Sequence, residues 1–396
     1  MHGPSIIGRG SAYTQPRPAY SWQLPTRHSP RYCSAVASDS GPQADAVHWA
    51  ALDGLRGVAV VAVLLYHAFP QLAPNGFAGV DVFFVLSGFL ITSLLVRERE
   101  RYGRVSLPNF YMRRILRLYP ALLLTVGLVL GLQAGRGELR EAVPGAVAAV
   151  LYVSHVTIGL GIDSGFLSHT WTLSLEEHFY LFWPVVLLGL LAGRLRRSLA
   201  VIALLMLGLA ILPGVLPGTV GAMYWRGLPM LVGSCIALVL PRLPPSTVWW
   251  GRSGLVSLAV LTVILMTPVA VPAVLMRGPF GIPTILSVVV IVGFVVARRS
   301  LGARFLSVVP LTWLGVRAYG LYLYHFPIVL SPVVSKLMSV LGVEMLWLGN
   351  MLLALGITVV CAGASYRWVE APFLRLKDRF RIRESRDPAA AASIRN

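Results

Sequence analysis

Apolar residues gather in long runs along this chain and do not alternate with polar residues. Runs of about 20 apolar residues are long enough for a helix to cross a hydrocarbon layer of about 30 Å. The pattern therefore predicts an all-α fold, a polytopic transmembrane helical bundle. The eleven apolar runs lie at about residues 54–73, 78–96, 118–134, 142–160, 171–192, 199–217, 222–240, 254–275, 280–297, 308–332 and 343–366.

The basic residues between the runs indicate which runs cross the membrane. Lysine and arginine are enriched in cytoplasmic loops, and arginines cluster here at residues 97–117, 194–197 and 298–304. These clusters share one side only if one run before Arg194 fails to cross, and the run at 142–160, which contains proline and glycine, is the weakest. We therefore expect about ten spans plus one re-entrant or interfacial segment, in the plasma membrane, with both termini in the cytoplasm.

Composition excludes two other classes of protein. Of the 396 residues, 56% are hydrophobic and 13% are charged, whereas about 25% of the residues of a soluble domain are charged. A soluble globular enzyme and a disordered chain are both excluded. A net charge of +18 would suggest a nucleic-acid partner in a soluble protein, but membrane topology explains the excess here, and we expect no nucleic-acid partner.

The apolar runs define one membrane domain between two tails. Residues 1–47 are rich in Pro, Ser, Gly and Ala, which predicts a disordered N-terminal tail. Residues 48–375 form the predicted membrane domain, and residues 376–396 form a basic and Ala-rich C-terminal tail. The three cysteines are far apart in the sequence, so we expect neither a disulfide framework nor a metal site.

The first apolar run carries an arginine and a histidine where ionisable groups are costly, at about 2.5–3.5 kcal/mol each. Arg56 and His67 are eleven residues apart, so a helix places both on one face, separated by about 16.5 Å along its axis. Asp53 can pair with Arg56 across one turn. Arg56 equally fits a membrane-surface anchor, and His67 fits either an interhelical hydrogen bond or a general base.

A pair of arginines begins the third span. Arg114 and Arg117 are three residues apart and share a helix face. Two converging guanidinium groups at a membrane surface can clamp phosphates. Attraction to anionic lipids is the alternative explanation.

Carboxylates occur in the second and fifth runs. Asp81 lies near the outer end of the second run and fits a helix cap as well as a catalytic role. Glu176 and Glu177 project about 100° apart on a helix and cannot act together as a paired acid and base. We expect Glu176 to face the protein interior and Glu177 to face the interface.

Further aromatic and histidine side chains are candidates for acceptor binding or for structural roles. His169 and Trp171 precede the two glutamates in the stretch SHTWTLSLEEHFYLFWP. His325 and Tyr322 share a helix face in the stretch YGLYLYHFP, and a structural histidine fits best there. The sequence holds no metal-ligand spacing, Walker loop, Rossmann glycine pattern or GxSxG elbow.

Five motifs in this order resemble the acyltransferase 3 family of integral membrane proteins. The motifs are LDGLRGVAVVAVLLYH, GVDVFFVLSGFLIT, FYMRRILRLYP, HTWTLSLEEHFYLFWP and YGLYLYHFP. The resemblance implies a ten-span core and the transfer of acyl groups, commonly acetyl, from acyl-CoA to hydroxyls of carbohydrates or glycosylated metabolites. The short C-terminal tail resembles the stand-alone type, and relatives often carry Gln at the position of His178.

The resemblance also implies roles for individual residues. Arg56 and His67 match the family's first-span pattern, and Arg114 and Arg117 match its paired arginines. With no bound cofactor and acyl-CoA as co-substrate, we expect the arginines to bind the donor's phosphates. His67 is expected to act as general base or to carry the acyl group, with Asp81 or Glu176 orienting its ring. A transporter or flippase of a glycosylated or acylated metabolite is the alternative.

Overall fold

The computed structural model describes residues 49–380 except residues 192, 194, 212–213, 217–218, 245, 331 and 341–346. Over this part of the chain every regular element is a helix, which confirms the predicted all-α class. The predicted N-terminal tail, at residues 1–47, lies outside the described residues, as do residues 381–396 of the predicted C-terminal tail.

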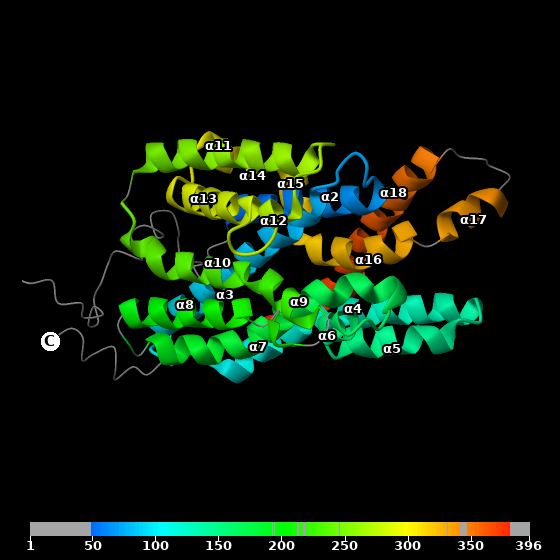
Figure 1. Ribbon diagram of the computed structural model, residues 1–396, viewed down its shortest axis with the longest axis horizontal. Coiled ribbons are helices and arrows are strands. Elements are labelled where there is room, and N and C mark those ends of the chain that lie inside the picture. Colours follow the sequence, from blue (N-terminus) through cyan, green and yellow to red (C-terminus); the bar gives the residue numbers. More distant parts are fainter. Residues whose placement is uncertain are drawn as a thin grey trace, which may run out of the picture.

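The helices form one bundle (Figure 1). Its apolar helices at the predicted spans are α2 (Ala50–Ala68), α3 (Gly79–Tyr102), α4 (Leu107–Gly135), α7 (Trp171–Leu191), α8 (Leu195–Ile211), α10 (Pro229–Val239), α11 (Thr247–Met266), α13 (Ile282–Val296), α16 (Ala318–Leu330) and α18 (Trp347–Ser365). The connecting ones are η1 (Gly76–Ala78), α5 (Leu139–Val150), α6 (Ser154–Gly159), η2 (Gly165–Thr170), α9 (Val220–Gly227), η4 (Leu240–Arg242), α12 (Ala273–Met276), α14 (Leu301–Leu306), α15 (Val309–Val316), α17 (Val333–Val340), the π-helical turn η5 (Tyr366–Glu370), α19 (Ala371–Leu376) and η6 (Lys377–Phe380).

Seven continuous helical segments within the described residues are long and apolar enough to cross a membrane, which identifies a multi-pass membrane protein. They are Ala50–Ala68, Gly76–Tyr102, Leu107–Gly135, Gly165–Leu191, Val220–Arg242, Thr247–Met266 and Trp347–Leu376. Three shorter apolar helices are Arg197–Leu209, Ile282–Val296 and Ala318–Leu330. Ten crossings require all three shorter helices to cross as well, so the expected number stays a prediction.

Two apolar runs are broken into shorter helices. The run at 142–160 consists of α5 and α6, which meet beside Tyr152, a residue in the left-handed region with φ of 54°. The run at 308–332, expected as one span, is instead α15 and α16, which meet at Arg317. The guanidinium group of Arg317 stacks on the ring of Trp313 at 4.3 Å. A positively charged residue therefore lies between the two helices, within a run that hydropathy predicted to be one span.

Helix α3 packs closely against α2 and α10 because glycine residues lie at the contacts. Gly79 of α3 lies against the Ala59 carbonyl of α2, and Gly88 lies against the Met230 carbonyl of α10. A Cβ atom at either glycine would overlap that backbone oxygen. Small residues allow membrane helices to approach this closely, and the close contacts place α2 and α3 at the core of the bundle.

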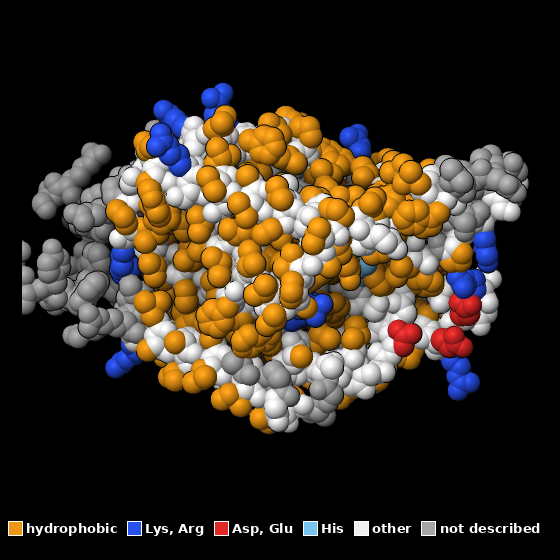
Figure 2. Space-filling model, turned by 45° about the horizontal axis from the view of Figure 1, so that its top comes forward, with side chains coloured by type: hydrophobic (Ala, Val, Ile, Leu, Met, Phe, Trp, Pro, Cys, Tyr) orange, Lys and Arg blue, Asp and Glu red, His pale blue; other side chains and the backbone are white. Residues whose placement is uncertain are grey.

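Basic side chains gather at one end of the bundle. At one end, Arg97 stacks on Trp49 at 4.4 Å, and Arg113 pairs with Glu98 at 2.9 Å and donates to the Phe380 carbonyl at 2.7 Å. These contacts join the start of α2, the end of α3, the start of α4 and the segment after α19, and we call this the basic end. Figure 2 shows a broad hydrophobic surface between the two ends of the molecule, interrupted by a few basic side chains.

Candidate active site

Three arginines from two helices converge near the basic end. Arg56 extends from α2, and Arg114 and Arg117 extend from the first turns of α4. The charges of Arg56 and Arg114 both act on Arg117, so Arg117 lies within electrostatic range of the other two guanidinium groups. We call them the arginine cluster. Arg56 also forms the predicted ion pair with Asp53 at 2.9 Å.

Glu176 faces the arginine cluster from α7. The charges of all three arginines act on its carboxylate, which accepts a hydrogen bond from the Ser87 hydroxyl of α3. Tyr180, one turn further along α7, lies under the guanidinium group of Arg114 at 4.0 Å. Four helices, α2, α3, α4 and α7, therefore contribute to one polar centre inside the bundle.

Glu177 also belongs to this centre, contrary to its expected place at the interface. The charges of Arg114 and Arg117 act on its carboxylate. Helix α4 contacts α7 next to Glu177, where the guanidinium group of Arg114 lies over the ring of Tyr180. The charge of Arg117 also acts on the buried carboxylate of Glu370, which accepts a hydrogen bond from the Ser365 hydroxyl at 3.4 Å.

Three histidines meet further along α2. The rings of His67 and His325 have centroids 4.9 Å apart, and those of His325 and His169 are 5.6 Å apart. Tyr322 donates to the His169 carbonyl at 2.9 Å and accepts from the Thr172 hydroxyl at 2.8 Å. We call His67, His169 and His325 the histidine cluster. Within the described part of the chain, no group of three such side chains is arranged to hold a metal ion.

Hydrogen bonds define the tautomers of two of these rings. Nδ1 of His67 lies 2.9 Å from the Val63 carbonyl, and Nδ1 of His325 lies 2.6 Å from the Tyr322 carbonyl. A carbonyl oxygen only accepts, so each Nδ1 carries the proton when the ring is neutral. Nε2 of His325 is then an acceptor for the His67 Nδ1–H at 3.3 Å. Nε2 of His67 keeps its lone pair, and no described residue forms a hydrogen bond with it.

The carboxylates expected to orient His67 have other partners. Asp81 is fully buried, lies 3.6 Å from Arg226, and does not act as a cap for α3. Glu176 contacts Ser87. The ring of His67 is instead held by the Val63 carbonyl and by His325, because α16 lies beside α2 at this level.

Trp171 contacts an arginine that the sequence analysis missed. The guanidinium carbon of Arg226 is 4.8 Å from the centre of the Trp171 ring. Arg226 is the group that pairs with Asp81. Its position inside the apolar run at 222–240 was the available signal, since an arginine there requires a partner.

His155 lies in α6, outside the candidate spans, and its environment indicates a structural role. Burial, assisted by the neighbouring ring of His178, lowers the pKa of His155 to about 4. Its ring packs edge-on against those of His178 and Tyr224, with centroids 4.6 and 5.1 Å away. A neutral, enclosed ring of this kind packs the bundle.

Comparison with known proteins agrees with the sequence motifs. Residues 49–367 match a family model described as an acyltransferase domain. The O-acetyltransferase OatA of Staphylococcus aureus strain NCTC 8325 is 32% identical over 345 residues, which cover 81% of this chain and 56% of OatA. OatA of strain COL matches over the same length.

The chain thus spans about half the length of the curated relatives that it matches. No solved structure matches it. Because the family match covers residues 49–367 of 396, the chain belongs to the acyltransferase 3 family, as its five motifs predict.

Proposed function

We propose that this protein is a membrane O-acyltransferase that moves an acyl group, acetyl above all, from acyl-CoA to a hydroxyl of a carbohydrate or glycosylated metabolite. One observation carries the proposal: α2 contributes Arg56 to the arginine cluster and His67 to the histidine cluster. The two residues are about 16.5 Å apart along the helix axis. Membership of the family, and relatives named as O-acetyltransferases, support this activity.

The arginine cluster is the proposed binding site for the phosphates of the donor. Arg114 and Arg117 are both partly exposed, and a guanidinium group can bind a phosphate through two parallel hydrogen bonds. The carboxylates of Glu176 and Glu177 interact with the charges of the cluster and would hold its guanidinium groups close to one another. The acyl end of the donor would then extend along α2 toward His67.

His67 is the proposed general base. Its free Nε2 accepts the proton of the acceptor hydroxyl while the hydroxyl oxygen attacks the thioester carbonyl. A carbon–oxygen ester bond forms, the carbon–sulfur bond breaks, and the imidazolium returns its proton to the departing CoA thiolate. His325 keeps the imidazole in the required tautomer, since its Nε2 accepts from the Nδ1–H of His67.

The proposed orientation follows from the distribution of arginine. The basic end holds Arg97, Arg113, Arg114 and Arg117, and positive charge favours the cytoplasmic side. Acyl-CoA is made in the cytoplasm, so this orientation presents the arginine cluster to its ligand. We propose accordingly that ten helices cross the plasma membrane and that the chain enters and leaves the bundle on the cytoplasmic side.

Transfer of label tests the proposed function directly. Membranes that contain the protein, supplied with acetyl-CoA labelled in the acetyl group, are expected to yield labelled ester on an acceptor sugar hydroxyl and free CoA in equal amounts. Mass spectrometry of the acceptor measures the added acetyl mass. Movement of an acylated metabolite across the membrane without transfer of label would support the transporter alternative and reject the enzyme.

Replacing Arg117 with alanine is expected to raise the KM for acyl-CoA by roughly tenfold or more, because a charge-assisted hydrogen bond to phosphate is lost. The KM for the acceptor should change little. Initial rates at varied concentrations of each substrate measure both constants. Arg104→Ala is the matched control, since Arg104 is exposed at the basic end, outside the cluster. Equal effects of the two substitutions on the donor KM would contradict the assignment.

A further inference from the structure

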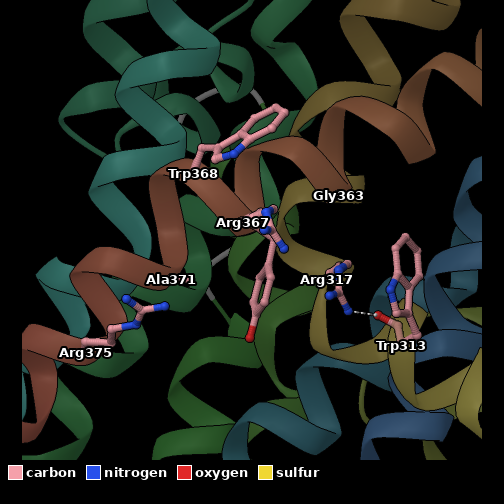
Figure 3. A pocket seen from close by; sticks show the side chains of 8 residues that line it. Trp313, Arg317, Gly363, Arg367, Trp368, Ala371 and Arg375 are labelled. Carbon is pink, nitrogen blue, oxygen red and sulfur yellow. Dashed lines mark hydrogen bonds between the residues drawn. The ribbon is translucent and has the colours of Figure 1, made fainter.

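A second basic site lies near the basic end, outside the arginine and histidine clusters. A cavity of about 630 Å³ opens between the junction of α15 with α16 and the segment η5–α19. Three arginines line it: Arg317, Arg367 and Arg375 (Figure 3). Figure 3 shows Arg317 and Arg375 on opposite sides of the cavity, with Arg367 between them. We call it the α18 pocket.

The positive charge of the α18 pocket has no counter-charge within it. None of its three arginines is in ion-pair contact with an acidic side chain among the described residues. The nearest buried carboxylate, that of Glu370, feels the charges of both Arg317 and Arg117. Three cations around one open cavity without a paired anion attract an anionic ligand.

Arg317 is held in a fixed position that suits such a ligand. Its guanidinium carbon lies 4.3 Å from the centre of the Trp313 ring and 4.4 Å from that of the Tyr366 ring. One Nη donates to the Trp313 carbonyl at 3.2 Å, and the buried Nε–H has no acceptor among the described residues. Aromatic stacking fixes the plane of the guanidinium group and leaves donors unused, as phosphate recognition requires.

The surroundings of the α18 pocket indicate a ligand that lies in the membrane. The pocket is built on the end of the Trp347–Leu376 candidate span, of which only 22% is buried inside the protein. Trp368, which also lines the pocket, is 71% exposed, and Val360 two turns earlier is 69% exposed. Tryptophan collects at the level of lipid headgroups, and an apolar flank beside the cations fits acyl chains better than a soluble nucleotide.

We propose that the α18 pocket binds the phosphate of an anionic phospholipid headgroup, with the lipid's acyl chains lying along the exposed face of α18. Arg317 provides the fixed donors, and Arg367 and Arg375 provide further charge at the rim. The shared chemistry is a phosphate group, which the nucleotide end of acyl-CoA also carries. The proposal concerns lipid binding and does not depend on acyl transfer.

Native mass spectrometry of the full-length protein tests this site. Purified protein is titrated with phosphatidylglycerol or with phosphatidylcholine of the same acyl chains, and bound lipids are counted. Wild-type protein is expected to retain one phosphatidylglycerol molecule under conditions that remove phosphatidylcholine. The double variant Arg317→Gln, Arg375→Gln is expected to bind it at least roughly tenfold more weakly, since each arginine near a membrane surface contributes about a factor of five.

Arg140→Gln combined with Arg252→Gln is the matched control, because it removes the same charge from two exposed positions outside the pocket. Equal loss of lipid in the control would show general attraction and overturn the proposal, as would unchanged binding by the pocket variant. Displacement of the lipid by free CoA, or a raised KM for acyl-CoA in the pocket variant with lipid binding intact, would assign the site to the nucleotide instead.

Two single variants keep the test decisive if the double variant does not fold. Arg375 is exposed, so Arg375→Gln should leave the fold intact and weaken lipid binding severalfold. Arg317→Lys retains the charge but not the stacked, forked geometry, and it should bind phosphatidylglycerol more weakly than wild type. Wild-type affinity in both single variants would reject the proposed site. Acyl transfer is measured separately, so failure here leaves the proposed enzyme activity standing.

Discussion

Replacing His67 with glutamine is expected to abolish acyl transfer, lowering the turnover number by roughly 10²–10⁴-fold, the usual contribution of a general base. Glutamine can still donate a hydrogen bond to the Val63 carbonyl, as Nδ1 of His67 does. It offers no basic nitrogen in place of Nε2. The substitution therefore removes the proton acceptor and keeps the nearest backbone contact.

The measurement is single-turnover transfer of labelled acetyl by purified protein, with its melting temperature recorded in parallel. His178→Gln is the matched control: it makes the same exchange at a half-buried ring on α7 that contacts His155 and neither cluster. The control should keep close to wild-type activity. If His67→Gln retained more than about a tenth of that activity while remaining folded, His67 would not be the base.

Helical periodicity predicted which residues lie on one side of α2 but not what they contact. The spacing of Arg56 and His67 is a property of one helix, and it can be calculated from the sequence. The partner of His67 is His325, 258 residues away, and no local pattern encodes that pairing. The pairing of Asp81 with Arg226 on another helix is likewise not encoded in any local pattern.

Hydropathy predicted the membrane class and most of the helices, but it could not place breaks within apolar runs. The run at 308–332 contains enough apolar residues for a span, yet the chain turns at Arg317 between α15 and α16. Rings from α15 and η5 stack on its guanidinium group at this turn. Tertiary contacts of this kind cannot be predicted from the number of apolar residues in a run, so hydropathy does not show where such a helix ends.

The short helix α15 also determines where α2 lies, because the two helices meet at backbone distance. Gly315 of α15 lies against the Asp53 carbonyl, and Gly57 of α2 lies against the Leu311 carbonyl. Gly54 lies in the same way against the Leu306 carbonyl. Small residues allow membrane helices to approach so closely. Both Arg56 and His67 are carried by the helix that this contact positions.

Replacing Gly315 with alanine is expected to destabilise the protein by about 1–3 kcal/mol or more, because the new Cβ would overlap the Asp53 carbonyl oxygen. A backbone oxygen cannot rotate away as a side chain can, so α2 must shift and take the ion pair of Asp53 and Arg56 with it. We expect less protein in the membrane, a lower melting temperature and lower activity per folded molecule. Fluorescence-detected gel filtration after heating measures the folded fraction.

Gly127→Ala on α4 is the matched control for this substitution, since nothing lies within 4 Å of the position that its Cβ would take. Alanine there should leave stability unchanged or raise it by up to about 1 kcal/mol, since alanine has the higher helix propensity. The difference between the two variants isolates the contact of α15 with α2 from the general effect of replacing glycine in a helix. Equal melting temperatures would mean that α2 does not depend on backbone contact with α15, and the positions of Arg56 and His67 would then need another support.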